Sequence, residues 1–269
     1  MKRAWPVLCL LSGLALSGCV DGGFGTPFRE SLEESRPLAA NGEFTLENTN
    51  GTVRLAAWDE AKVRIEAEKH AASEHALRQL QVEIVGEGDR LSVRTRQPHL
   101  HFFGGSGRVD YRVSVPRGAR VRVVNVNGRV EVDGVTAAVR ARTVNGSVEV
   151  TGAAAEVEAR AVNGSVEVSF ARVDPAGRSE LSSTNGSLRL TLPPDAGADV
   201  EARTVNGGVA CDFDLAEARK SRRRIEGRIG TGGARFDLGT VNGSVHVDRG
   251  VAAAAARTPA EAPEKRPSR

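Results

Sequence analysis

The stretch Thr143–Val150 reads Thr-Val-Asn-Gly-Ser-Val-Glu-Val, and residues 161–168, eighteen positions later, read Ala-Val-Asn-Gly-Ser-Val-Glu-Val. The Asn-Gly pair recurs along the chain, with glycines at positions 51, 128, 146, 164, 186, 207 and 243. From Gly128 onward the spacings are 18, 18, 22, 21 and 36, and we interpret the last as two periods of 18. A short period of strand-like sequence is typical of repeat proteins whose units stack on their neighbours. The repeat therefore predicts an all-β scaffold.

Positions counted from the glycine of each repeat predict which side chains face the interior. The second and fourth positions after the glycine hold valine or leucine in nearly every repeat, and the fifth position before it holds Val, Ala or Leu. We assign these positions to the core, because alternate residues of a strand face the same side. Cys211 occupies one of them and is expected to pack as a small buried hydrophobe. The Val or Thr two positions before the glycine breaks the alternation, which predicts a corner or bulge there.

Two all-β folds are compatible with this pattern. We favour a single-stranded β-solenoid, similar to a β-helix, whose rungs of about 18–22 residues turn at Asn-Gly. Like residues would then stack as ladders along the axis, and an asparagine ladder can form hydrogen bonds between rungs. The alternative is an antiparallel β-meander, because Asn-Gly is also the strongest short signal for a β-hairpin.

In either fold the Asn-Gly pairs form the turns. These turn residues are Asn50, Gly51, Asn127, Gly128, Asn145, Gly146, Asn163, Gly164, Asn185, Gly186, Asn206, Gly207, Asn242 and Gly243. Among the outward positions, Glu131, Glu149 and Glu167 are expected on one face, and Arg142 and Arg160 on another. Stacked like charges repel, so such rows are either tolerated for binding or are solvated faces, and both interpretations stay open.

The first residues predict an exported lipoprotein. Met1-Lys2-Arg3 precedes an apolar run, residues 7–16, that is too short to span a bilayer. The following Leu16-Ser-Gly-Cys19 resembles the lipobox of bacterial lipoproteins, which implies cleavage before Cys19 and attachment of acyl chains such as palmitate to it. Val20, in place of Asp, implies sorting to the outer membrane by resemblance to Gram-negative lipoproteins, with the membrane face undetermined. An ordinary secretory signal is the alternative.

Five segments are expected along the chain. Residues 1–18 are the signal peptide, 19–41 the lipidated cysteine and a flexible tether, 42–116 an N-terminal strand segment of the solenoid, 117–250 the regular repeat, and 251–269 a disordered tail of alanine, proline and charged residues. Within the strand segment, Ser73 followed by Ala76, Leu77 and Leu80 predicts one short helix.

Charge and composition argue against nucleic-acid binding. Removal of residues 1–18 lowers the formal net charge from +3 to +1, and the tail contributes +2, which leaves a body of about −1. Such a body lacks the positive surface that nucleic-acid-binding domains present. Aromatic residues make up only 4% of the chain, so a module that binds bases by aromatic stacking is also disfavoured.

Two segments contain candidate binding residues. Phe102 and Phe103 lie in a glycine-rich loop, where they either form an exposed adhesive patch or cap the core. His99 and His101 in the same loop have no adjacent third ligand, so no metal site is predicted. The second segment is a dense basic run, predicted to be a protruding loop that contacts anionic lipid headgroups or polysaccharide or is simply solvated; it comprises Arg219, Lys220, Arg222, Arg223 and Arg224.

Residues 44–247 resemble the bacterial "putative adhesin" β-strand-repeat family, a domain of unknown function also called a head domain. The similarity rests on Trp58-Asp59, on Tyr111-Arg-Val-Ser-Val-Pro-Arg-Gly118 and on the serial Thr-Val-Asn-Gly-Ser-Val elements. It also includes the final elements, residues 225–233 and 239–247. The resemblance implies a β-solenoid at the cell envelope, and it implies no catalytic residue or cofactor.

Three functions are compatible with the sequence to different degrees. We favour a non-enzymatic, lipid-anchored envelope rod for adhesion, scaffolding or partner binding, with an envelope glycan or a protein as the partner. The alternative is an envelope-stress sensor or regulator, a role proposed for some proteins that resemble this family. An enzyme acting on polysaccharide is disfavoured, because stacked glutamates one rung apart lie closer together than the ~5 Å or more that glycosidase carboxylates use.

Overall fold

The computed structural model describes residues 28–97 and 107–250. Within these ranges the strands are β1 (Phe28–Asn50), β2 (Val53–Trp58), β3 (Lys62–Ala71), β4 (Gln81–Arg96), β5 (Arg108–Pro116), β6 (Arg120–Asn127), β7 (Val130–Asp133), β8 (Val139–Asn145), β9 (Val148–Ala153), β10 (Val157–Asn163), β11 (Val166–Phe170), β12 (Arg178–Asn185), β13 (Leu188–Leu192), β14 (Ala198–Asn206), β15 (Val209–Cys211), β16 (Leu215–Ser221), β17 (Arg224–Ile229), β18 (Ala234–Asn242) and β19 (Val245–Arg249). The predicted short helix is present as α1 (Glu74–Gln79), and the Ser73 side chain accepts a hydrogen bond from the Ala76 N–H at its start. No helix of the described residues is long and apolar enough to cross a membrane.

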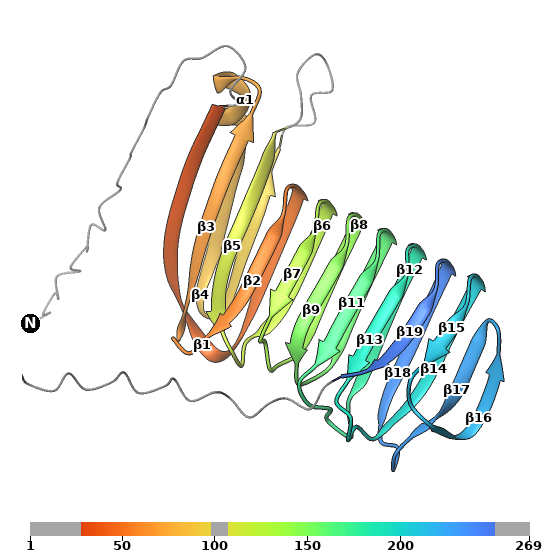
Figure 1. Ribbon diagram of the computed structural model, residues 1–269. Helices are drawn as coiled ribbons and strands as arrows, with labels where there is room; N and C mark the ends of the chain where they lie inside the picture. Colours follow the sequence, from red (N-terminus) through yellow and green to blue (C-terminus); the bar gives the residue numbers. More distant parts are fainter. Residues whose placement is uncertain (1–27, 98–106, 251–269) are drawn as a thin grey trace, which may run out of the picture.

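Each repeat forms one rung, which consists of a strand of sheet B, a corner at Asn-Gly and a strand of sheet A (Figure 1). Successive rungs stack in parallel, so that β6, β8, β10 and β12 are neighbours in sheet B, while β7, β9, β11 and β13 are neighbours in sheet A. The register is one-to-one, with Asn127, Asn145, Asn163 and Asn185 opposite one another. This parallel stacking confirms the β-solenoid and excludes the antiparallel meander for these repeats.

The predicted inward positions fill the space between the two sheets. In the rung of β8 and β9, Ala141, Val148 and Val150 are 0, 0 and 2% exposed. Val209 and Cys211 pack against the core as predicted, but they are only partly buried. They belong to β15, which pairs with β19 on one side and with no described strand of sheet A on the other. The last rung therefore lacks the neighbour that would cover its inward side chains.

The corners bring the glycines of neighbouring rungs into close contact. Gly164 has a φ of +157°, and a Cβ built on it would lie 1.9 Å from the carbonyl oxygen of Gly146. A side chain cannot occupy that space, which explains why glycine is required at the corner. Beside the glycines runs a hydrogen-bonded ladder of exposed amides, in the spatial order Asn50, Asn127, Asn145, Asn163, Asn185, Asn242 and Asn206.

Just before each corner, one side chain points inward and the next points outward to solvent. Three positions before the glycine, Thr143 donates through Oγ1 to the carbonyl oxygen of Gly128 at 3.1 Å, which satisfies a polar group at a largely buried position. Two positions before the glycine, the side chain points to solvent, as the break in alternation predicts. Five valines at this position are 36–54% exposed: Val126, Val144, Val162, Val205 and Val241.

Replacing one amide of the ladder is expected to cost a modest amount of stability. Asn163 donates to Asn145 at 2.8 Å and accepts from Asn185 at 2.9 Å, so Asn163→Ala removes two hydrogen bonds. We expect the free energy of unfolding, measured with urea, to fall by about 1–2 kcal/mol. Asn206→Ala is the matched control, because Asn206 ends the ladder and forms one such bond, to Asn242 at 2.8 Å. Equal losses in the two variants would contradict this account of the ladder.

At both ends of the rod the rungs are stacked out of sequence order. The C-terminal rung of β18 and β19 lies between the rung of β12 and β13 and the rung of β14 and β15. At the other end, the second half of β1 lies between β4 and β6, and β2 lies between β5 and β7. Figure 1 shows the rung of β18 and β19, in blue, inside the rod and not at its end. The first and last rungs along the chain are therefore both interior rungs.

The C-terminal end of sheet B is closed by an antiparallel hairpin of β16 and β17 that packs on β14. The spacing of 36 between Gly207 and Gly243 therefore contains this hairpin, and our interpretation of it as two periods is wrong. The outer strand β16 has charged, exposed side chains and a bulge between Ala216 and Arg219, at which Glu217 has a φ of 51°. Charges and a bulge protect such an edge from pairing with another chain.

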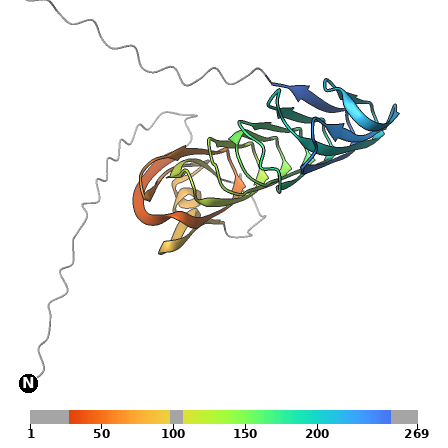
Figure 2. The ribbon, with the colours of Figure 1, turned by 90° about the horizontal axis from the view of Figure 1, so that it is seen from below.

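The N-terminal strand corrects the predicted tether. β1 begins at Phe28, so residues 28–41, expected to be flexible, are part of a strand. Residues 28–37 pair antiparallel with β3 at the edge of sheet A, and residues 43–50 lie in sheet B. β1 thus passes around the end of the rod (Figure 2). The first half of β1 was not predicted as a strand, because most of its side chains are exposed and the sequence there has no alternating apolar pattern.

Candidate functional site

The outward side chains of sheet B form rows along the rod, since the same position of successive rungs recurs at the strand spacing of about 4.8 Å. The row six positions before the corner glycine changes sign along the rod. In spatial order it comprises Arg122, Arg140, Glu158, Glu180, Asp237 and Glu201. The face therefore divides into a part with stacked carboxylates and a part with stacked arginines.

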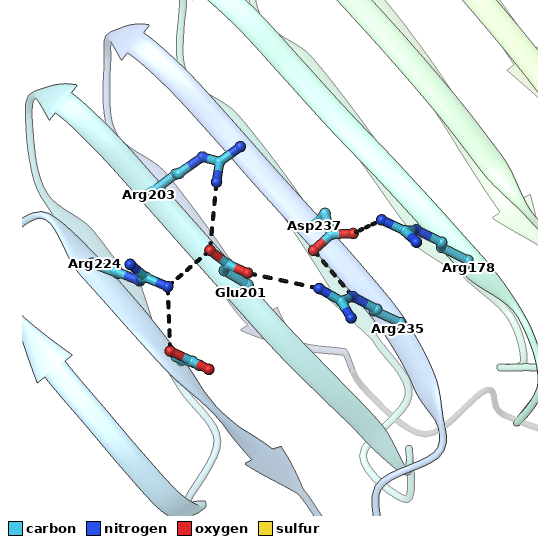
Figure 3. Close-up of polar contacts among 7 residues, drawn as sticks. Arg178, Glu201, Arg203, Arg224, Arg235 and Asp237 are labelled. Carbon is cyan, nitrogen blue, oxygen red and sulfur yellow. Dashed lines mark hydrogen bonds and ion pairs between the residues drawn. The ribbon is translucent and has the colours of Figure 1, made fainter.

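In the C-terminal part of this face, arginines on both sides of the carboxylate row compensate it (Figure 3). Asp237 contacts Arg178 at 2.9 Å and Arg235 at 3.4 Å. Glu201 contacts Arg224 at 3.1 Å and Arg203 at 3.5 Å. These pairs form a continuous network across β12, β18, β14 and β17, and such networks offset the repulsion between stacked carboxylates.

A shallow, open hollow of about 360 Å³ lies within this network. Each of its four carboxylates lies within ion-pair distance of an arginine; for example, Arg228 is 3.3 Å from Asp199 and 3.2 Å from Glu217. Its lining residues include Asp199, Glu201, Glu217, Glu226, Arg228 and Arg235. Carboxylates held in this way act as partners of arginine, and the hollow is best described as part of the charged network.

In the N-terminal part of the same face, five arginines form a diagonal band across β6, β8 and β10. We call it the arginine stripe, and it comprises Arg120, Arg122, Arg140, Arg142 and Arg160. Arg122 lies directly opposite Arg140, and Arg142 directly opposite Arg160. Our sequence analysis identified the second pair but missed the first, although alignment of the repeats on their glycines places Arg122 and Arg140 in the same position.

Glu158 is the carboxylate that compensates most of this stripe. It forms an ion pair with Arg142 and lies 3.0 Å from Arg160 and 3.4 Å from Arg140. Partial burial alone would raise the pKa of Glu158, but the hydrogen bond from Arg142 and the positive charges of the three arginines together hold that pKa below its usual range.

The lowered pKa gives a prediction for stability. A carboxyl group whose pKa is lower in the folded chain stabilises the fold above its unfolded-state pKa, and this contribution is lost as the pH falls through the folded-state value. We expect Glu158→Gln to lower the free energy of unfolding by about 1 kcal/mol at neutral pH. The difference from the wild-type chain should vanish in acid, as followed by urea unfolding across a pH series. A difference that persists in acid would show that the ion pairs are not its cause.

Sheet A presents the opposite charge on its outer face. Glu131, Glu149 and Glu167 lie opposite one another in successive strands, as the sequence predicts. Asp133 adds to them, and Arg54 compensates Glu131 at 2.9 Å. In the central rungs, glutamates therefore predominate on the outer face of sheet A, whereas sheet B carries the arginines together with Glu158 and Glu180.

The basic run forms the tip of the β16–β17 hairpin, so it is part of the cap and not a loop between rungs. The backbone of the tip is docked on the last corner, because the carbonyl oxygens of Arg222 and Arg223 accept hydrogen bonds from the N–H groups of Val209 and Thr204. Arg224 contacts Glu201 and Glu226. The other side chains of the run, Arg219, Lys220, Arg222 and Arg223, are exposed and form no ion pair with a described residue.

Of the remaining candidate residues, only Cys211 belongs to the described part of the chain. Cys19, Phe102, Phe103, His99 and His101 lie outside the described residues. Cys211 is half-buried, and burial raises the pKa of its thiol, against the opposing effect of a hydrogen bond with the Phe213 backbone. A raised pKa disfavours the reactive thiolate. Among residues 28–97 and 107–250, no three His, Cys, Asp or Glu side chains are grouped so as to hold a metal ion.

Comparison with known proteins finds several bacterial solved structures that are similar to this chain at low identity. One is described as a putative cell adhesion protein from Clostridium sporogenes, with 11% identity, a TM-score of 0.48, and coverage of 82% of this chain and 100% of that chain. A second is a putative adhesin from Bacteroides fragilis, with 9% identity, a TM-score of 0.39, and coverage of 82% and 99%. A third, a putative lipid binding protein from Parabacteroides distasonis, has 9% identity, a TM-score of 0.30, and coverage of 85% and 97%.

None of the curated proteins searched matches the sequence. A family model does match residues 107–248. This range includes the rungs from β6 onward, the β16–β17 hairpin, and the rung of β18 and β19 except its final residue. On this match, the chain belongs to the Toastrack DUF4097 family.

Proposed function

We propose that this chain is a lipid-anchored, non-enzymatic rod of the bacterial cell envelope that binds a partner at the end farthest from its anchor. The opposite placement of two elements supports this role. β1, which begins nine residues after Cys19, lies at one end of the rod, and the β16–β17 hairpin with its exposed basic tip lies at the other (Figure 1). The eight residues between Cys19 and Phe28 span at most about 30 Å, so the N-terminal end would face the membrane.

The exposed cations of the tip suit a partner with negative charge. Arg219, Lys220, Arg222 and Arg223 are held on a hairpin whose backbone is fixed by β14 and β15, so they are presented on a rigid support. An anionic envelope glycan or the acidic surface of a protein would meet these side chains when the rod stands away from the membrane. Adhesion and scaffolding both require this arrangement, and neither requires turnover.

Anchoring is tested by fractionation of cells that express the wild-type chain or Cys19→Ala, with metabolic labelling by palmitate. The wild-type chain should carry label and sediment with outer membranes, and the variant should be unlabelled and soluble. Protease treatment of intact cells then assigns the face: rapid loss places the rod outside, and protection until the outer membrane is opened places it in the periplasm. An unlabelled wild-type chain would contradict the anchor.

Binding at the tip is tested with the triple variant Lys220→Ser, Arg222→Ser and Arg223→Ser. Purified chain is sedimented with isolated envelope glycan, and the triple variant should be recovered at least about fivefold less than the wild-type chain. The control removes three exposed cations from the anchored end, Arg29, Arg36 and Arg90, which should leave recovery unchanged. Equal loss in the two triple variants would show that net charge, and not the tip, governs binding.

A further inference from the structure

We propose that the arginine stripe of sheet B is a second binding site, which takes a linear anionic polysaccharide laid along the rod across β6, β8 and β10. The site differs from the hairpin tip in position and in composition, so it stands independently of the tip's role. The stripe was defined above by Arg120, Arg122, Arg140, Arg142 and Arg160.

The stripe contains positive charge that the fold does not compensate. Arg122 and Arg140 lie directly opposite each other on neighbouring strands, an arrangement that destabilises a sheet. No described residue lies within ion-pair distance of Arg120 or Arg122, whereas the arginines Arg178 and Arg235 of the same sheet both contact Asp237. The carboxylates of the neighbouring strand β1, Glu43 and Glu47, lie opposite Arg120 and Val124, but they form ion pairs with Arg90 and Arg94 on the other side.

The spacing of the stripe suits oxyanions. Neighbouring strands are about 4.8 Å apart, so the guanidinium groups of Arg122 and Arg140 can approach one sulfate, phosphate or carboxylate group from both sides. The planar fork of each arginine donates two parallel hydrogen bonds to such a group. Arg142 and Arg160 repeat the arrangement one strand further along and two residues further toward the corner. A ligand that follows the stripe therefore needs negative groups at intervals along a chain.

The surroundings of the stripe favour a polysaccharide over a membrane. Stable binding to a bilayer surface combines basic residues with apolar side chains that enter it. Within the described part of sheet B, the outward side chains beside the stripe are charged or polar apart from the half-buried Val124, and the exposed valines lie on the corner. The stripe crosses three successive strands of the stack, so an extended chain that follows it contacts the rungs in order.

Glu158 is the internal competitor of the ligand in this site. It lies opposite Arg140 and contacts Arg140, Arg142 and Arg160, so it occupies donors that an anionic group would otherwise receive. Replacing it with glutamine keeps the size of the side chain and releases Arg140 and Arg142, whereas Arg160 stays paired with Glu180 at 3.1 Å. If the stripe binds an anionic ligand, Glu158→Gln should strengthen that binding. If the charged face is purely structural, Glu158→Gln should give no gain in affinity.

The test measures binding of the full-length chain to dextran sulfate, with neutral dextran as the blank, by fluorescence anisotropy at several salt concentrations. Arg122→Gln/Arg140→Gln should weaken binding about tenfold or more and make its salt dependence shallower. Glu158→Gln should tighten it about threefold. The matched control, Arg178→Gln/Arg235→Gln, removes the same charge from the same sheet and should change the affinity less than about twofold.

Folding is monitored by the thermal midpoint of each variant. Arg122→Gln/Arg140→Gln should retain the wild-type midpoint or exceed it, because the substitution relieves a like-charge pair. Equal weakening by the two double variants would overturn the site in favour of general charge attraction, as would an unchanged affinity of Glu158→Gln. Sedimentation with vesicles of phosphatidylcholine and phosphatidylglycerol that depends on Arg122 and Arg140, without binding to dextran sulfate, would assign the stripe to a membrane and overturn the polysaccharide.

Discussion

Gly164→Ala is expected to lower the free energy of unfolding by at least about 3 kcal/mol, although it adds a single methyl group at a partly exposed corner. The Cβ would lie 1.9 Å from the carbonyl oxygen and 2.5 Å from the carbonyl carbon of Gly146. Both atoms belong to the backbone of the neighbouring rung, so they cannot move without separating the two rungs. The φ of +157° adds strain for any residue with a side chain.

The chain provides a control for this substitution at another corner. Gly208 follows the corner glycine Gly207, and a Cβ on Gly208 would meet no atom within 4 Å. Gly208→Ala should therefore change stability by less than about 0.5 kcal/mol. Both variants are measured by urea unfolding, followed by circular dichroism. If Gly164→Ala were as stable as Gly208→Ala, the close approach between neighbouring corner glycines would not be needed for the stack.

Truncation of the chain after Gly233 is expected to unfold the whole C-terminal end of the rod. It removes β18 and β19, and with them the buried side chains Phe236, Leu238, Val245 and Val247. Each contributes about 1.5–3 kcal/mol by burial, and the loss of Phe236 also ends its edge-to-face contact with Phe170, whose ring centroid is 5.2 Å away. Because the missing rung is an interior one, β14 and β15 lose the strands on which they stack.

Amide hydrogen exchange tests this expectation strand by strand. In the truncated chain, protection should be lost across residues 198–229 and kept in β6 to β11. A chain that ends at Gly250 is the control, since it keeps β19 and the hydrogen bond from the Gly250 N–H to the Leu192 carbonyl. If β14 and β15 stayed protected in the shorter chain, they would have docked directly on β12 and β13, and the inserted rung would not be required to support them.

The sequence predicted what happens within a rung better than it predicted how rungs are ordered. Spacing from Asn-Gly identified the corner, the inward positions and the amide ladder, because each of these depends only on a residue's place in its own repeat. It could not identify the neighbours of a rung. Every rung presents the same Val, Asn and Gly positions to the next, so β14 offers an equivalent edge to β12 and to β18. Contacts between residues far apart in the sequence, and not the repeat itself, place the rung of β18 and β19 between its two neighbours.

For the candidate sites too, the sequence predicted what depends on a single repeat and missed what depends on contacts between distant residues. The stacking of Glu131 with Glu149 follows from the repeat and was predicted. The docking of the basic run depends on an antiparallel hairpin, which has no counterpart in the other repeats. The pairing of charges between rows, as between Arg178 and Asp237, joins residues 59 positions apart through the inserted rung and carries no local signal. The stacking of Arg122 on Arg140 also follows from the repeat, but the lack of an ion-pair partner for Arg122 is visible only in three dimensions.

The inserted rung also sets an order of events during synthesis. The ribosome makes β14 and β15 before β18 and β19, so the growing chain holds a rung whose final neighbour does not yet exist. Until those strands are made, β14 and β15 have nothing to stack on, and the edges of β12 and β13 stay unpaired. The mature arrangement becomes accessible only when residue 249 has been made.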